Sequence, residues 1–181
     1  MMFEFTNRRG NLSALCTALY LATFLTACNA EPGADKRAAV AAPAAKVEAA
    51  AIYTDADFKG TISGESLDFS GLEEVETEQV KSFRKTGVNP YVGNASILKE
   101  AEQDYLARCS GCHGHIGEGK LGPALNDNYW TYPANETDKG LFETIYGGAN
   151  GMMGPQKGLT PQDEILKIIA WIRNFKNIVP H

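Results

Sequence analysis

The apolar residues near the end of the chain recur at intervals of three and four, the spacing that places side chains on one face of an α-helix. This apolar stripe comprises Ile165, Ile168, Ile169 and Ile172, with Trp171 beside it. Helix-start signals come just before the stripe: Thr160 suits the N-cap, Pro161 the first helical position and Asp163 the first turn. The pattern therefore predicts a closing amphipathic helix with a buried isoleucine face.

Three shorter helices are predicted upstream. Residues 78–85 have a helical pattern and are followed by Gly87, a residue type that commonly ends helices. Residues 138–146 follow Thr137, a favourable N-cap. Residues 96–108 carry a further apolar face at helical spacing. That face comprises Ile97, Ala101, Tyr105 and Leu106.

Only one segment shows the period of a β-strand. Residues 58–71 alternate around Gly64 and Glu65, which predicts a β-hairpin. The chain has 181 residues, enough for one domain with appendages. The expected fold class is therefore mainly α, with an N-terminal extension made of this hairpin and the helix at 78–85.

The first 27 residues have the pattern of a targeting segment. Arg8 and Arg9 give a positive start, and residues 12–27 are apolar and uncharged. This apolar run is shorter than the roughly 20 residues that span a bilayer. A removed signal peptide is therefore the favoured interpretation, and a retained membrane anchor is the alternative.

The end of this segment suggests lipidation. The sequence LTAC at residues 25–28 resembles the lipobox of bacterial lipoproteins, whose cysteine becomes the lipidated first residue of the mature chain. We therefore expect a lipid on Cys28. Ordinary cleavage near Ala30, with Cys28 incidental, is the alternative. Either route exports the protein.

The domain organisation follows from composition. Residues 28–51 are rich in alanine and contain no aromatic residue, so they predict a flexible tether. The expected order is a lipoprotein-type signal peptide at 1–27, the tether at 28–51 and one domain at 52–181.

Charge and cysteine content narrow the function. Removal of residues 1–27 takes away two arginines and one glutamate, so the formal net charge changes from −5 to −6. An acidic surface argues against nucleic acid and anionic lipid as partners and predicts a basic patch on any docking partner. Beyond Cys28, only Cys109 and Cys112 remain, so an exported domain would have no disulfide framework.

The strongest chemical signal is CSGCH at residues 109–113. Two thiols three positions apart on a turn can reach the two vinyl groups along one haem edge, and the next histidine is then placed beneath the iron. The motif predicts one covalently bound haem c, attached at Cys109 and Cys112, with His113 as the proximal iron ligand.

Three other interpretations fit the motif less well. A thioredoxin-like redox pair expects a βαβ setting, whereas the preceding segment has a helical pattern. A zinc site that adds His115 would need ligand pairs from separated segments. A disulfide between Cys109 and Cys112 would be strained.

The iron needs a second axial ligand, and methionine is the best candidate. Met152 and Met153 lie in GGANGMMGP at residues 147–155. Glycine lets the backbone approach the porphyrin, and Pro155 restricts the loop. Met153 is preferred because it directly precedes Gly154 and Pro155, with packing in a core as the alternative for either methionine. A thioether ligand raises the reduction potential.

An aromatic segment, NYWTYP at residues 128–133, follows the haem motif. Trp130 could donate its indole N–H to a haem propionate, while Tyr129 and Tyr132 could wall the pocket. Plain core packing is an equal alternative for each of them.

From about Phe58 onward, the sequence resembles the cytochrome c-L family, the electron acceptors of quinoprotein methanol dehydrogenases. The resemblance is carried by CSGCHGHIGEGKLGPALNDNYWTYP (109–133), TDKGLFETIYGGANGMMGP (137–155) and TISGESLDFS (61–70). It implies a class I cytochrome c-like monohaem fold with a haem core at about 95–176.

The resemblance also implies individual roles. His113 and Met153 would be the axial ligands, the Pro123 carbonyl would accept a hydrogen bond from the His113 ring, and Leu125 would pack on the haem. The general reason for the Pro123 contact is that a ligating histidine needs its other nitrogen fixed.

The implied function is periplasmic electron transfer without enzyme activity. Electrons would arrive singly from the pyrroloquinoline quinone of a methanol dehydrogenase, of calcium or lanthanide type, and leave to another cytochrome or an oxidase. The membrane would be reached only through a lipid on Cys28. The alternatives are an anchored haem subunit of another respiratory complex and a haem peroxidase-type enzyme.

Overall fold

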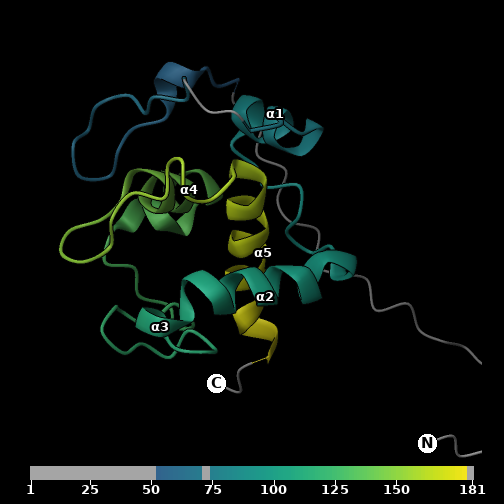
Figure 1. Ribbon diagram of the computed structural model, residues 1–181, viewed down its shortest axis with the longest axis vertical. Helices are drawn as coiled ribbons and strands as arrows, with labels where there is room; N and C mark the ends of the chain where they lie inside the picture. Colours follow the sequence, from purple (N-terminus) through teal and green to yellow (C-terminus); the bar gives the residue numbers. More distant parts are fainter. Residues whose placement is uncertain (1–51, 71–73, 179–181) are drawn as a thin grey trace, which may run out of the picture. The chain divides into compact units, whose positions relative to one another are not determined.

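The computed structural model describes residues 52–70 and 74–178. The predicted signal peptide, the tether and Cys28 lie outside these residues. Regular structure in the described part is helical (Figure 1). It comprises α1 (Glu78–Thr86), α2 (Leu98–Arg108), α3 (Ser110–His113), α4 (Asp138–Gly147) and α5 (Gln162–Ile178), with 3₁₀ turns η1 (Asp55–Asp57), η2 (Ala95–Ile97) and η3 (Pro133–Glu136). The predicted mainly α class is confirmed. None of these described helices combines the length and the apolarity that crossing a bilayer requires.

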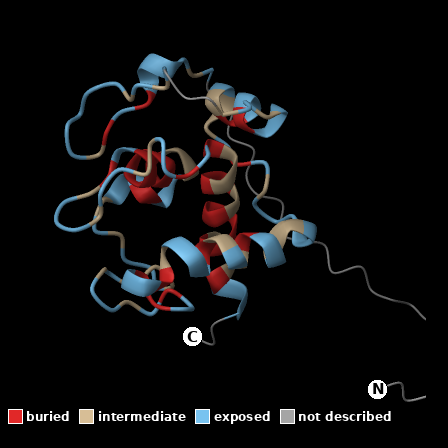
Figure 2. Cartoon of the chain, in the orientation of Figure 1, coloured by how far each residue is buried: buried red, intermediate tan, exposed pale blue. Residues whose placement is uncertain are grey.

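Helix α5 is the element around which the others pack. It contacts α1, α2 and α4, and α2 crosses it (Figure 1). Its predicted apolar face is buried, and Figure 2 shows the buried residues gathered on α4 and α5. Burial of each such side chain stabilises the fold by about 1.5–3 kcal/mol. The buried apolar side chains of α5 are Ile165, Leu166, Ile168, Ile169, Ala170, Trp171, Ile172 and Phe175.

The start of α5 differs from the prediction. The helix begins at Gln162, one residue later than a Thr160 N-cap requires, and Thr160 Oγ1 instead donates to Gln156 Oε1 at 3.0 Å. The first helical N–H is satisfied by a distant side chain, because Gln162 N donates to Glu74 Oε2 at 2.8 Å. A carboxylate is a strong acceptor at a helix N-terminus, so a tertiary contact replaced the local cap.

The other helix ends agree with the sequence. Thr137 Oγ1 accepts from Gly140 N at 3.0 Å and caps α4 as predicted. Gly87 adopts a positive φ of 68° at the end of α1, also as predicted. Helix α2 carries the expected buried face at Ala101 and Tyr105, whereas Leu106 is 39% exposed and lies off that face.

The predicted hairpin is reduced to a tight reversal. Lys59 and Ser66 form an isolated antiparallel bridge, with Gly64 at a φ of 68° between them, and no strand occurs in the described residues of this segment. A two-stranded hairpin is marginally stable by itself. The segment is held instead by Phe58, which is buried in an aromatic cluster. Its ring neighbours are Tyr53, Phe69, Phe83 and Phe142.

Candidate functional site

A cavity of about 510 Å³ is lined by residues of α3, α4 and α5 and by the loops between these helices. Sites that hold cofactors usually have volumes of roughly 300–1,000 Å³ and mostly apolar walls. The apolar wall here comes from Leu125, Leu141, Ile145, Ile168 and Ile172. The cavity is therefore large and apolar enough for a bulky organic group.

Both cysteines of the motif line this cavity. Helix α2 runs directly into the motif, since Cys109 N donates to Tyr105 O at 2.8 Å and α3 begins at the next residue. Both thiols are free, and Cys112 is exposed. Burial raises the pKa of the Cys109 thiol to about 12. The helix α2 ahead of the motif also differs from the βαβ setting of a thioredoxin-like redox pair, so that alternative does not fit.

The zinc alternative also lacks support from the geometry. Nowhere in residues 52–70 and 74–178 do three or more His, Cys, Asp or Glu side chains cluster as a metal site would require. Structural zinc needs four such ligands in a tetrahedron. His115 is exposed and is absent from the cavity lining.

The His113 ring is buried, and its orientation is set by the loop that follows the motif. Its Nδ1 lies 2.9 Å from the carbonyl oxygen of Pro123, the contact that the resemblance implied. With the Nδ1 hydrogen donated to that carbonyl, Nε2 carries the lone pair that can bind a metal. Gly122 packs against the ring, because a Cβ at this position would lie 2.7 Å from His113 Cε1. The sequence prediction overlooked Gly122, although the Gly-Pro pair was visible.

The methionine loop follows α4. Gly148 has a φ of 85°, and Ala149 N donates to Met153 O at 2.9 Å, which closes the loop on itself. Met153 is half-buried, packs against the core and lines the cavity. Met152 also borders the cavity but is 77% exposed. Of the two thioethers, that of Met153 is the one held inside the protein.

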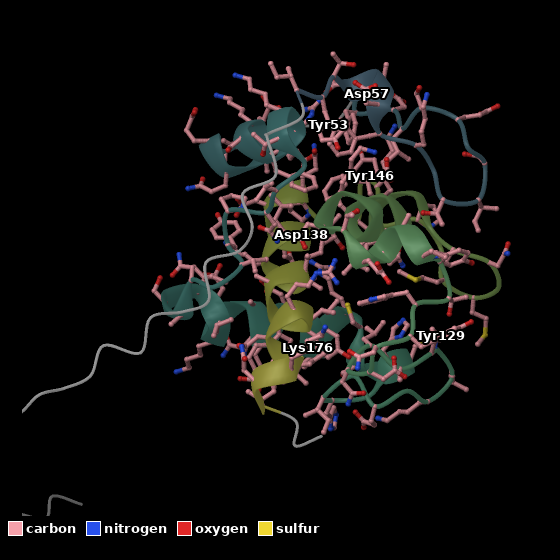
Figure 3. All side chains as sticks on the ribbon, turned by 180° about the vertical axis from the view of Figure 1, so that it is seen from behind. Tyr53, Asp57, Tyr129, Asp138, Tyr146 and Lys176 are labelled. Atoms are coloured by element: carbon pink, nitrogen blue, oxygen red, sulfur yellow. The ribbon has the colours of Figure 1, made fainter. Side chains whose placement is uncertain are left out.

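The aromatic segment contributes only part of the predicted wall. Trp130 and Tyr132 line the cavity. Tyr129 does not: it is 70% exposed and lies at the edge of the chain in Figure 3. The prediction for Tyr129 is wrong: its side chain is exposed, whereas the next residue, Trp130, packs against the core. The Trp130 ring is covered by Arg173, whose Cζ is 5.2 Å from the ring centroid.

Two buried polar residues in the cavity wall were not predicted. Asn135 of η3 and Thr144 of α4 line the cavity and are joined by a hydrogen bond of 2.7 Å. Neither belongs to a motif, so their position could be learned only from the packing of η3 against α4.

The donor set of the cavity fits haem c. Two cysteines, one histidine and two methionines, of which Met153 is the more buried, border the same apolar space. Haem c is held by two cysteine thioethers and commonly by histidine and methionine axial ligands. Helical packing around such a cavity defines the chain as a c-type cytochrome.

Comparisons with known proteins name the family. Cytochrome c-L of Methylorubrum extorquens strain AM1 is 53% identical over 141 residues, which cover 76% of this chain and 71% of the relative. The chain belongs to the cytochrome c-L family. A broader family profile, described as cytochrome C oxidase, cbb3-type, subunit III, matches residues 97–172.

Two solved structures agree. Cytochrome cL of Hyphomicrobium denitrificans is 56% identical with a TM-score of 0.63, covering 70% of this chain and 74% of that one. Cytochrome cL of Methylophaga aminisulfidivorans MPT is 53% identical with a TM-score of 0.63, covering 65% of this chain and 79% of that one. The cofactor is therefore covalently bound haem c, and the role is electron transfer.

Proposed function

We propose that the thiols of Cys109 and Cys112 attach the haem and that His113 and Met153 are its axial ligands. The haem supplies one-electron chemistry when bound. The chain orients the imidazole through Pro123, excludes water with an apolar wall that includes Leu125, and holds the thioether in a closed loop. A methionine ligand favours ferrous iron and so raises the reduction potential.

The proposed electron donor is a methanol dehydrogenase that carries pyrroloquinoline quinone, and the acceptor is another cytochrome or an oxidase. The identity to proteins named cytochrome c-L over most of the chain carries this proposal. Such a carrier makes and breaks no substrate bond, and its interface is expected to be small and transient, below about 1,200 Å².

The proposed compartment is the periplasm, with residues 1–27 removed as a signal peptide. Lipid on Cys28 and a flexible tether at 28–51 would leave the domain at 52–181 free to reach its partners near a membrane. Labelling with a tagged fatty acid tests the lipid. Wild-type protein should take up the label and the Cys28→Ala variant should not.

Stopped-flow reduction tests the partner. Purified holoprotein is mixed with a methanol-reduced dehydrogenase, of calcium type in one series and of lanthanide type in another. We expect saturable reduction of the haem whose rate falls as salt rises, because the chain is acidic. Ascorbate reduction of the same sample is the control. Reduction by ascorbate but by neither dehydrogenase would refute the partner and leave the haem assignment intact.

A second candidate function is favoured by the broader family profile, which describes an oxidase subunit. In that case the chain would be an anchored haem subunit of a respiratory complex. Affinity capture from membranes separates the two: co-purification of oxidase subunits in fixed proportion supports the second candidate, and their absence supports the first.

A further inference from the structure

Three polar side chains link the N-terminal segment to the wall of the cavity. Thr61 Oγ1 lies 2.7 Å from Thr144 Oγ1, and Thr144 Oγ1 donates to Asn135 Oδ1 at 2.7 Å. Asn135 is only 5% exposed and Thr144 is also buried. Burial of such groups is costly unless each is hydrogen-bonded, so their place in an apolar wall requires a reason.

The chain of hydrogen bonds has a direction. A threonine hydroxyl carries one hydrogen. Thr144 donates this hydrogen to Oδ1, the side-chain oxygen of Asn135. Thr144 Oγ1 must then accept from Thr61 in the neighbouring contact. Because the amide oxygen of Asn135 is occupied, its two N–H hydrogens are left for another acceptor. None of the described residues supplies one.

A half-buried cation, Arg173, binds the backbone of the same segment. Arg173 of α5 donates through Nη2 to the backbone carbonyl oxygen of Asn135 at 2.8 Å and through Nε to Asp138 Oδ1 at 2.9 Å. Figure 3 shows Asp138 beside α5. The guanidinium also covers the Trp130 ring. One positive charge therefore contacts both the Trp130 ring and the backbone of Asn135.

We propose that Thr61, Thr144 and Asn135 present the Asn135 amide to a carboxylate of the haem, with Arg173 as a positioning residue behind it. A haem is apolar except for its iron and its two carboxylates, and amide donors beside a cation favour an anionic oxygen. The proposal rests on the haem site proposed above. It gives the segment at 52–70, which lies outside the matched range 97–172, a part in setting the reduction potential.

The test is spectroelectrochemical titration of the full-length holoprotein over a range of pH. Asn135→Leu should lower the reduction potential, because a less neutralised carboxylate stabilises ferric iron. It should also move the pH-dependent step of the potential to higher pH, because loss of a donor raises the pKa of a carboxylate. Thr61→Val should shift the reduction potential and the pH of its pH-dependent step in the same directions, but by less. Thr61→Ser keeps the hydroxyl and should leave both at their wild-type values.

The ionisable side chains near Asn135 are already paired, so the pH-dependent step is assigned to the haem carboxylate. The charged side chains next to Asn135 are Arg173 of α5, which stays protonated, and Asp138 of α4, which is paired with Arg173. Arg108 also lines the cavity, but it is paired with Glu164. Thr86→Val is the matched control, since its hydroxyl bonds to Ser82 O within α1. It should leave the potential unchanged.

Two results would overturn the proposal. One is a potential-against-pH curve for Asn135→Leu that superimposes on that of wild type. The other is a loss of the weak red-end band of thioether-ligated ferric haem, which would place the amide at the axial sulfur instead. If Asn135→Leu fails to fold, the two Thr61 variants provide the test. A reduction potential that is the same in Thr61→Val, Thr61→Ser and wild type would then overturn the proposal. Covalent haem is checked first in wild type, so failure of the haem site itself is seen separately.

Discussion

His113 Nδ1 and the carbonyl oxygen of Pro123 are 2.9 Å apart, although ten positions separate the two residues. The contact fixes which ring nitrogen carries the hydrogen and turns Nε2 toward the cavity. Partners of this kind are worth roughly 10–100-fold in metal affinity. The backbone between them therefore matters as much as the histidine itself.

The first prediction concerns Gly122. In Gly122→Ala, a Cβ would lie 2.7 Å from His113 Cε1 and 2.9 Å from Nδ1, so the ring must turn away from the Pro123 carbonyl. We expect the affinity of the His113 nitrogen for the iron to fall by roughly 10–100-fold. Acid titration followed in the visible spectrum measures this: the loss of the histidine ligand should occur at a higher pH in the variant than in wild type.

Gly111→Ala is the matched control. It lies between the two cysteines, yet an added Cβ there meets nothing within 4 Å. Its visible spectrum and the pH of its acid transition should match those of wild type. Equal behaviour of the two variants would show that Gly122 does not position the ring.

The second prediction separates the two methionines. Met153→Leu should abolish the red-end band of the ferric protein and lower the reduction potential, because the thioether ligand that favours ferrous iron is lost. Met152→Leu removes an exposed side chain and should change neither property. Redox titration with the ferric spectrum measures both. The reverse pattern would assign the ligand to Met152.

The third prediction concerns acid stability. Burial alone raises the pKa of Asp163, but hydrogen bonds from Thr77, Tyr91 and Lys167 lower it further than burial raises it, to below 3.8. A group whose pKa is lowered on folding adds stability above its unfolded pKa and loses it as pH falls through the folded pKa. Asp163→Asn should therefore lower the free energy of unfolding by about 1–2 kcal/mol at neutral pH.

The difference between wild type and Asp163→Asn should narrow as the pH falls below about 4. Urea denaturation across pH measures it. Glu65→Gln, at an exposed position, is the control and should follow wild type. A gap that stays constant down to the lowest pH would contradict the lowered pKa.

The fourth prediction concerns the start of α5. Glu74 accepts the Gln162 N–H at 2.8 Å, so Glu74→Ala should cost about 0.5–2 kcal/mol, the usual value of an N-cap. Glu78→Ala removes an exposed partner of Lys81 and should cost less stability than Glu74→Ala. Thermal unfolding of the holoprotein compares them. Equal losses would mean that the distant carboxylate is no cap.

Local chemistry explains why some elements were predictable. Thr137 begins α4 by accepting a hydrogen bond with its side chain, and Gly87 ends α1 by adopting a positive φ. Both act as predicted. Thr160 has an equally suitable side chain, yet Glu74 reaches the helix end from 88 positions away. Of the expected hairpin the structure has the isolated Lys59–Ser66 bridge, and Phe58 of this segment is buried among aromatic rings from distant parts of the chain.

The sequence by itself determined the haem motif, the helical periodicity and the family, because each depends on residues within a short span of chain. The tertiary structure alone decided how Asn135, Thr144 and Arg173 surround the cavity, since no local pattern marks a side chain as the neighbour of another element. It also decided that Met153 faces inward and that Tyr129 does not. The physical reason is that burial and long-range hydrogen bonds are set by packing, which a one-dimensional pattern does not contain.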